Sequence, residues 1–135
     1  MRLALGTDED TSLVGDIIGH LEASGHEVVV LARPLRWPEV GADVGEAVAR
    51  REVDMGVVCC WTGTGVSIAA NKVPGVRAAL CGDAITAAGA RKWNDANVVA
   101  LSLRTTTPAV AAEIIDAFLT TGADPGEADA VAMLR

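Results

Sequence analysis

Residues 60–65, with the sequence Cys-Trp-Thr-Gly-Thr-Gly, combine the residue types that could do chemistry in this chain. A thiol, hydroxyls and two glycines follow an apolar run, and a helical pattern starts at Gly65. A strand that turns into a helix in this way points backbone N–H groups at one place, where an oxyanion or a phosphate can bind. The same positive field favours a thiolate, so Cys60 could act there as a base or a nucleophile.

Each of these features also has a purely structural explanation. Gly63 and Gly65 alone would allow a tight turn, and Cys60 alone would fit a small buried core residue. Their combination with Thr62, Thr64 and the helical pattern that follows favours a ligand-binding loop. Whether Cys60 is a base or a core thiol stays open on the residues alone.

The elements that must position this loop are predicted from alternating apolar runs and helical patterns. The alternation predicts a single α/β domain over residues 1–135, with a five-stranded parallel sheet, helices on both faces and right-handed crossovers. Residues 32–38 are expected to form a loop because they contain two prolines, and residues 121–135 are expected to form a tail or a short helix. The predicted strands cover residues 2–6, 27–31, 53–60, 76–81 and 97–101, and the predicted helices cover residues 11–24, 40–51, 65–71, 83–93 and 108–120.

Polar side chains follow several of the predicted strands, and ligands bind beyond the carboxyl ends of the strands in such sheets. Asp8 and Glu9 come after the first strand, Trp37 falls in the loop after the second, and Arg104 follows the fifth. We expect these residues near residues 60–65. The alternatives are that Asp8 only caps a helix and that Arg104 is a solvated surface residue.

Composition excludes several classes of function. The chain has a net charge of −7 with scattered basic residues, which argues against nucleic-acid binding and against an anionic membrane surface. Three cysteines without framework or zinc spacing argue against a disulfide scaffold and a metal site, and His20 and His26 are expected far from the carboxyl edge. Without a signal peptide or an apolar spanning segment, the expected location is cytoplasmic.

A longer pattern carries a family resemblance. Residues 60–81 read C-W-T-G-T-G-V-S-I-A-A-N-K-V-P-G-V-R-A-A-L-C, and N-D-A-N-V follows at residues 94–98. With Arg104, this pattern resembles the sugar-phosphate isomerase family of type B ribose-5-phosphate isomerase and galactose-6-phosphate isomerase. Weaker agreement, at Asp8 and at an aromatic–proline pair beginning with Trp37, extends the resemblance to most of the chain.

The resemblance implies a Rossmann-like homodimer, or a tetramer, whose active sites borrow residues from the partner. It also implies aldose–ketose isomerisation through a cis-enediolate, with no metal and no cofactor. Cys60 takes the position of the family's base and Thr62 that of its ring-opening threonine, while the amides of residues 63–65 stabilise the enediolate. Asn94 and Asp8 take the positions that bind substrate hydroxyls.

The departures from the family pattern concern the rest of the site. Glu9 and Trp93 stand where the family usually has histidines, the second of which opens the sugar ring, and Trp61 replaces a small residue. Residues 122–129 are acidic where the family carries arginine and histidine for the phosphate. Arg104 is the one clear survivor of that phosphate grip.

The sequence therefore predicts an aldose–ketose isomerase whose specificity is shifted away from ribose 5-phosphate. Its substrate would be an unphosphorylated or unusual sugar, or a short one that needs no ring opening, and Glu9, Trp37, Trp61, Trp93 and Arg104 would contact it. One alternative is a non-catalytic member, either a sugar-binding protein or a partner subunit of a homologous chain. Another alternative is ribose-5-phosphate isomerase itself.

Overall fold

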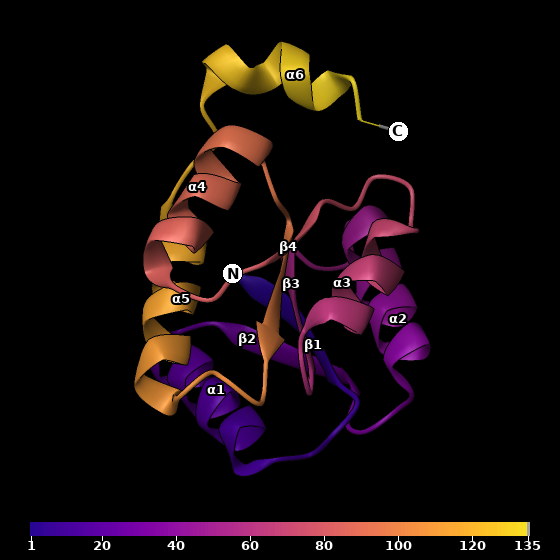
Figure 1. Ribbon diagram of the computed structural model, residues 1–135, viewed down its shortest axis with the longest axis vertical. Coiled ribbons are helices and arrows are strands. Elements are labelled where there is room, and N and C mark those ends of the chain that lie inside the picture. Colours follow the sequence, from indigo (N-terminus) through magenta and orange to yellow (C-terminus); the bar gives the residue numbers. More distant parts are fainter. Residues whose placement is uncertain (135) are drawn as a thin grey trace.

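The computed structural model describes residues 1–134, which form a five-stranded parallel sheet with the strand order β2-β1-β3-β5-β4 (Figure 1). This confirms the predicted fold class. The strands are β1 (Arg2–Thr7), β2 (Glu27–Ala32), β3 (Met55–Cys60), β4 (Ala78–Leu80) and β5 (Val98–Ser102). The helices are α1 (Ser12–Ala23), α2 (Trp37–Ala49), α3 (Thr64–Asn71), α4 (Ala84–Asn94), α5 (Pro108–Thr120), the 3-10 helix η1 (Pro125–Glu127) and α6 (Ala128–Ala132).

Helices cover both faces of the sheet, as Figure 1 shows with α1, α4 and α5 on one side and α2 and α3 on the other. Two separate apolar clusters correspond to these two faces. The central strand β3 is buried along both faces, so its successive side chains enter different clusters. Cys59 lies in the cluster under α1, α4 and α5, whereas Cys60 lies in the cluster under α2 and α3.

The start of α2 differs most from the sequence prediction, and the other boundaries of the predicted elements agree within two residues. Helix α2 begins at Trp37 and not at Val40, because the Glu39 carboxylate accepts a hydrogen bond from the Arg36 N–H and caps the helix. Pro38 does not prevent this, since a proline in the first helical turn loses no intrahelical hydrogen bond. The predicted loop over residues 32–38 is therefore shorter than expected, and Trp37 is carried by a helix.

Strand β4 covers only Ala78–Leu80, whereas residues 76–81 were predicted. The turn before it occupies Val76, whose N–H donates to the carbonyl of Val73 at 3.1 Å. The next N–H, that of Arg77, donates to the side chain of Asn97 at 2.8 Å. Side-chain and turn hydrogen bonds thus replace strand pairing at the start of this edge strand.

The C-terminal segment passes over the end of α4 and continues into α6 (Figure 1). Its connection begins with the Asp124 N–H, which donates to the Lys92 carbonyl at 2.8 Å. A short terminal helix is therefore present, as one of the two predicted forms of this segment, while Arg135 lies outside the described residues. Within the described part of the chain, no helix combines the length and the apolar character needed to cross a membrane.

Helices α2 and α3 approach each other closely at Gly41. A Cβ atom at this position would lie 2.5 Å from the Ala69 Cβ and 2.7 Å from the Ala70 nitrogen. Because the second of these atoms belongs to the backbone, no side-chain rotation can relieve the contact. Gly41 therefore sets how closely α2 can pack on α3, and with it the position of Trp37 at the start of α2.

We predict that Gly41→Ala lowers the free energy of unfolding by about 1–3 kcal/mol, because overpacking forces the two helices apart. Gly19→Ala is the matched control, since it also lies in a helix but meets no atom within 4 Å. This control should gain about 0.5–1 kcal/mol from helix propensity. Urea unfolding followed by circular dichroism measures both, and equal effects of the two variants would contradict the packing argument.

Candidate active site

Backbone hydrogen bonds join the loops that follow β1, β3 and β5. The Asp8 N–H donates to the Cys59 carbonyl at 3.2 Å, and the Leu103 N–H donates to the Cys60 carbonyl at 2.9 Å. These bonds extend the parallel pairing of β3 with its two neighbours past the ends of the strands. The residues after all three strands are therefore held at one place on the carboxyl edge, as the sequence predicted.

The loop after β3 turns around the Cys60 sulfur. Cys60 is only 5% exposed, and its Sγ accepts a hydrogen bond from the Gly63 N–H at 3.2 Å. Gly63 has a φ of +77°, and a Cβ there would lie 2.5 Å from the Leu80 Cδ1 and 3.0 Å from the Leu101 carbonyl carbon. A glycine is thus required for this turn, which places the thiol beside the start of α3.

The first turn of α3 offers backbone donors next to this thiol. The first hydrogen bond within the helix joins the Ser67 N–H to the Gly63 carbonyl at 3.3 Å. The N–H groups of residues 64–66 precede it, and such groups have no partner inside their own helix. These N–H groups lie at the positive end of the helix dipole. The start of α3 therefore favours negative charge on a ligand oxygen.

Two hydroxyls stand at the exposed side of the loop. The Oγ1 atoms of Thr62 and Thr64 are 2.7 Å apart and hydrogen bonded to each other. Both residues are exposed, so a ligand hydroxyl can replace one threonine as the hydrogen-bond partner of the other. Thr62 and Thr64 therefore lie together with Cys60, Gly63 and Gly65, as the sequence predicted.

Trp61 contributes its backbone to the loop while its indole is half exposed. Its carbonyl accepts hydrogen bonds from the Arg104 N–H and from the Ser102 Oγ, both at 2.9 Å. Ser102 in turn accepts from the Thr105 N–H at 3.2 Å. The sequence did not single out Ser102, although a buried hydroxyl at the end of a central strand was a signal that could have identified it.

Trp37 covers the loop from the side of α2. A Cβ atom at Gly65 would lie 3.0 Å from the indole atoms Cδ2 and Cε3, so the ring rests on this glycine. Gly65 therefore allows the aromatic ring to reach the first turn of α3. The structure thus places Trp37 beside residues 60–65.

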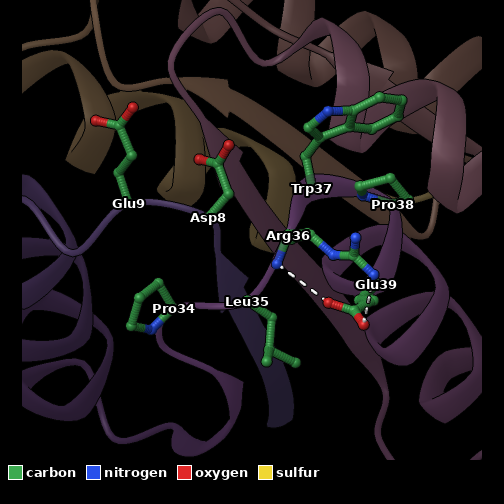
Figure 2. Close-up of a pocket in the computed structure, with 8 residues that line it drawn as sticks. All are labelled: Asp8, Glu9, Pro34, Leu35, Arg36, Trp37, Pro38 and Glu39. Carbon is green, nitrogen blue, oxygen red and sulfur yellow. Dashed lines mark hydrogen bonds and ion pairs between the residues drawn. The ribbon is translucent and has the colours of Figure 1, made fainter.

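A hollow of about 810 Å³ adjoins this ring and is drawn in Figure 2. The side chains of Asp8, Glu9 and Trp37 extend to the same side of it (Figure 2). Three carboxylates and one guanidinium line the hollow, and that guanidinium, of Arg36, lies 3.6 Å from the Glu39 carboxylate. The lining residues are Asp8, Glu9, Pro34, Leu35, Arg36, Trp37, Pro38 and Glu39.

Asp8 is the least exposed of the three carboxylates that line this hollow. Burial, and then the negative charge of Glu9, raise the pKa of Asp8 above its ordinary value of 3.8. Its Oδ1 is buried and finds no hydrogen-bond donor among residues 1–134. The Thr7 hydroxyl meanwhile fixes the turn by donating to the Glu9 carbonyl at 2.6 Å. Asp8 thus brings to the wall of the hollow a carboxylate with one oxygen left without a donor in the described part of the chain.

The other two cysteines are poor candidates for chemistry. Burial raises the pKa of Cys59 to about 12, with smaller contributions from Cys60 and Asp8. Burial, and then the charge of Asp83, raise the pKa of Cys81 to about 11. Both thiols therefore stay protonated at neutral pH, as is usual for buried core cysteines.

Asn94 and Trp93 do not reach the Cys60 loop within one chain. They end α4, which runs back from the carboxyl edge, and the next residues pair with the opposite end of the sheet through the bond from the Gly56 N–H to the Asn97 carbonyl. Strand β3, from Met55 to Cys60, spans the distance between the two edges. Within one copy of the chain, Trp93 and Asn94 therefore lie at the opposite end of the sheet from the Cys60 loop.

The two histidines also lie away from the carboxyl edge. The His20 Nε2 lies 2.7 Å from the Asp116 carboxylate of α5, and the His26 Nδ1 lies 3.0 Å from the amino group of Met1. Across residues 1–134, no group of three or more His, Cys, Asp or Glu side chains is arranged to hold a metal ion.

Comparison with known proteins places this chain in a family. The sequence profile of the Ribose/Galactose Isomerase family matches residues 3–133. The chain belongs to this family. The predicted family is thereby confirmed, and the prediction that the chain is an isomerase acting on sugars is confirmed at the level of the family.

Individual relatives have different substrates in their names. The chain is 41% identical over 126 residues to the D-erythrulose-4-phosphate isomerase of Pectobacterium atrosepticum. This match covers 88% of this chain and 82% of the relative. It is 40% identical over 104 residues to the galactose-6-phosphate isomerase subunit LacB of Clostridium acetobutylicum, covering 74% of this chain and 60% of the relative. The structure of Clostridium thermocellum ribose-5-phosphate isomerase B matches with a TM-score of 0.93 at 37% identity, over 98% of this chain and 93% of that one.

We predict that Asp8→Asn stabilises the fold at neutral pH and has no such effect in acid. Because the pKa of Asp8 is raised on folding, its contribution is fully present below the pKa of the unfolded chain and is lost as the pH rises through the folded pKa. The asparagine of the variant carries no charge at any pH, so the variant does not lose stability as the pH rises. Urea unfolding at about pH 3 and about pH 7 measures the difference.

Asp83→Asn is the matched control and should behave in the opposite way. The Asp83 carboxylate caps α4 by accepting a hydrogen bond from the Thr86 N–H at 2.7 Å, and this bond lowers the pKa of Asp83. Its contribution is present at neutral pH and is lost as the pH falls, so this variant should be destabilised at neutral pH and approach the parent chain in acid. The same pH trend in both variants would contradict the opposite pKa shifts of Asp8 and Asp83.

Proposed function

We propose that this chain is an aldose–ketose isomerase that moves a proton between C1 and C2 of a sugar through a cis-enediolate, with Cys60 as the base. The single observation that carries this proposal is the Gly63 N–H lying 3.2 Å from the Cys60 Sγ at the start of α3. A proton acceptor and a set of oxyanion donors are thereby fixed side by side. Enediolate chemistry requires both groups at once.

The proton and charge movements can be assigned to these groups. The Cys60 thiolate removes the proton from C2 of the open-chain aldose, and the electron pair moves onto the C1 oxygen. The N–H groups of residues 64–66 stabilise that negative charge. A proton passes from the C2 hydroxyl to the C1 oxygen, and the Cys60 thiol returns its proton to C1, giving the ketose. The Thr62 hydroxyl, on the exposed side of the loop, and the Asp8 carboxyl, which lines the neighbouring hollow, orient the substrate hydroxyls.

The charge of the neighbouring hollow supports a substrate other than ribose 5-phosphate. Asp8, Glu9 and Glu39 line it together with Arg36, which is already paired with Glu39. A phosphate dianion there would meet repulsion of about 1 kcal/mol per close charge pair even in bulk water. A neutral polyol would instead donate hydroxyls to the carboxylates and pack its C–H groups on the indole of Trp37.

A short sugar phosphate is the second candidate substrate, and Trp93 favours it. This residue stands where the resemblance implies the ring-opening histidine. A four-carbon sugar phosphorylated at its last carbon has no hydroxyl that closes a five-membered ring, so it needs no ring-opening group. The relative named D-erythrulose-4-phosphate isomerase supports this candidate, and Arg104, beside the loop, is the cation available for its phosphate.

Two further alternatives rest on relatives in the same family. The structural neighbour named ribose-5-phosphate isomerase B supports that activity, with Arg104 holding the phosphate. The relative named as a subunit of galactose-6-phosphate isomerase supports a role as a partner subunit, which would be inactive when purified alone. The substrate panel described next separates these outcomes.

The experiment that tests the proposal is proton NMR of the purified chain in D2O with aldoses and ketoses of four to six carbons, with and without terminal phosphate. Deuterium entering C1 or C2 reports the enediolate directly. Fastest exchange with an unphosphorylated or four-carbon sugar supports the shifted specificity. Fastest exchange with ribose 5-phosphate would refute that shift, and no exchange with any sugar would refute catalysis by the chain alone.

We predict that Cys60→Ala abolishes this exchange, with a loss of about a hundredfold or more, because general base catalysis contributes that much. Cys59→Ala is the matched control, since the adjacent thiol points into the opposite apolar cluster. It should retain exchange within about threefold of the parent chain, with only a core-packing loss of stability. Retained exchange in Cys60→Ala would move the base to Asp8 or Glu9.

The position of Asn94 leads to the proposal that two copies of the chain share each site. Asn94→Ala should lower kcat/KM about tenfold or more, because a substrate hydroxyl loses its partner, whereas Lys92→Ala, on the same exposed helix end, should not.

An equal mixture of Cys60→Ala and Asn94→Ala chains, refolded together, should regain about a quarter of the parent activity, since random pairing leaves one intact site in half of the dimers. Absence of any recovery would contradict the shared site.

A further inference from the structure

The turn that ends α4 is held in a backbone conformation that most side chains avoid. Asp95 has φ and ψ of 46° and 44°, which is the left-handed region. Glycine is the usual residue at such a helix end, and aspartate or asparagine is accepted because its side chain can bond locally. The bonds made by the Asp95 side chain therefore show what holds this turn.

Two arginines from different elements hold Asp95. The Arg91 Nη1 donates to Oδ1 at 2.9 Å, and the Arg77 Nη2 donates to Oδ2 at 3.3 Å. The Arg77 Nε also donates to the backbone carbonyl of Asp95 at 2.6 Å. Each carboxylate oxygen and the carbonyl thus has its own charged donor, so neither the side chain nor the backbone of Asp95 is free to rotate. We call Asp95, Arg77 and Arg91 the Asp95 clamp.

The clamp connects four elements at the amino edge of the sheet. Arg91 is only 8% exposed and donates in addition to the Ala96 carbonyl, just before β5, and from its Nε to the Thr121 carbonyl at the end of α5. The backbone of Arg77, just before β4, is fixed by the Asn97 side chain at 2.8 Å. Charged donors in so buried a position form stronger bonds than they would in water. The end of α4 is therefore a rigid point of the molecule.

The residues that this rigid point presents are exposed. Trp93 and Asn94 immediately precede Asp95, and the indole of Trp93 is 54% exposed. The clamp therefore holds in place a turn whose outer residues face solvent. Supporting contacts of this kind are what residues need when they must be positioned for a partner.

We infer that Asp95 is a positioning residue, which with Arg77 and Arg91 fixes Asn94 for the active site of a second copy of this chain. This inference rests on the proposed function, in which that site contains Asn94 from one copy and Cys60 from the other. Asp95 touches no substrate. It acts by setting the direction in which α4 delivers Asn94, so loss of the clamp misplaces Asn94 without removing it.

The test is Asp95→Asn, because asparagine also accepts the left-handed conformation and keeps one acceptor, while it loses the charge that both arginines bind. We expect kcat/KM for the best sugar of the panel to fall about tenfold or more, since small misplacement of a catalytic group is costly. Glu46→Gln is the matched control. It removes an exposed carboxylate 3.4 Å from Arg50 on α2, and it should leave kcat/KM within about twofold.

Mixed dimers separate positioning in the partner from damage within one chain. In a dimer of an Asp95→Asn chain and a Cys60→Ala chain, the one site with a thiol receives Asn94 from the chain whose clamp is intact. An equal mixture should therefore regain about a quarter of the parent activity. If the Asp95→Asn chain instead spoils its own Cys60 site, the mixture regains nothing, and the inference is overturned.

Hydrogen exchange of the free protein gives a readout that does not depend on activity. In Asp95→Asn, the amides of residues 93–97 should exchange at least about tenfold faster than in the parent chain, while those of residues 60–66 and of the Glu46→Gln control should not change. Unchanged exchange at residues 93–97 would refute the clamp whether or not the chain isomerises a sugar. Failure of the sugar panel with faster exchange at these residues would instead refute only the proposed function.

Discussion

The parallel pairing of β3 with β1 and β5 is the constraint on which the candidate site depends. The pairing does not stop with the strands, because the Cys59 and Cys60 carbonyls still accept hydrogen bonds from Asp8 and Leu103 beyond their ends. The loop around the thiol is therefore held from both sides by main-chain bonds. Such bonds depend little on side-chain identity, so the position of the thiol relative to the first turn of α3 follows from the sheet itself.

The close approach of α2 and α3 sets the second wall of the site. Gly41 lets the two helices touch, and this contact brings Trp37 at the start of α2 onto Gly65 in the first turn of α3. Two glycines on different helices thus determine where one indole lies. The hollow between Trp37 and the carboxylates of Asp8 and Glu9 follows from this packing and from the loop after β1 (Figure 2).

Much of this arrangement could be predicted from the sequence, because period and turn chemistry are local signals. The strand–turn–helix at Cys60 and Gly63 was predictable, since a positive φ followed by a helix requires glycine there. The start of α2 at Trp37 was not, because it depends on a capping bond to Glu39 that competes with the breaking effect of Pro38. The distance of Asn94 from Cys60 follows from the topology and not from the motif, because a helix after a parallel strand runs back from the carboxyl edge. The motif says only which residues meet.

The way Trp61 enters the loop has a consequence for how members of such a family diverge. Only its carbonyl bonds to Ser102 and Arg104, and its indole projects outward without taking part in the frame. Any side chain could occupy this position while the thiol and the amides keep their places. Selection can therefore vary the rim of the site by single amino-acid exchanges. New substrate preferences become accessible through variants that all keep the fold.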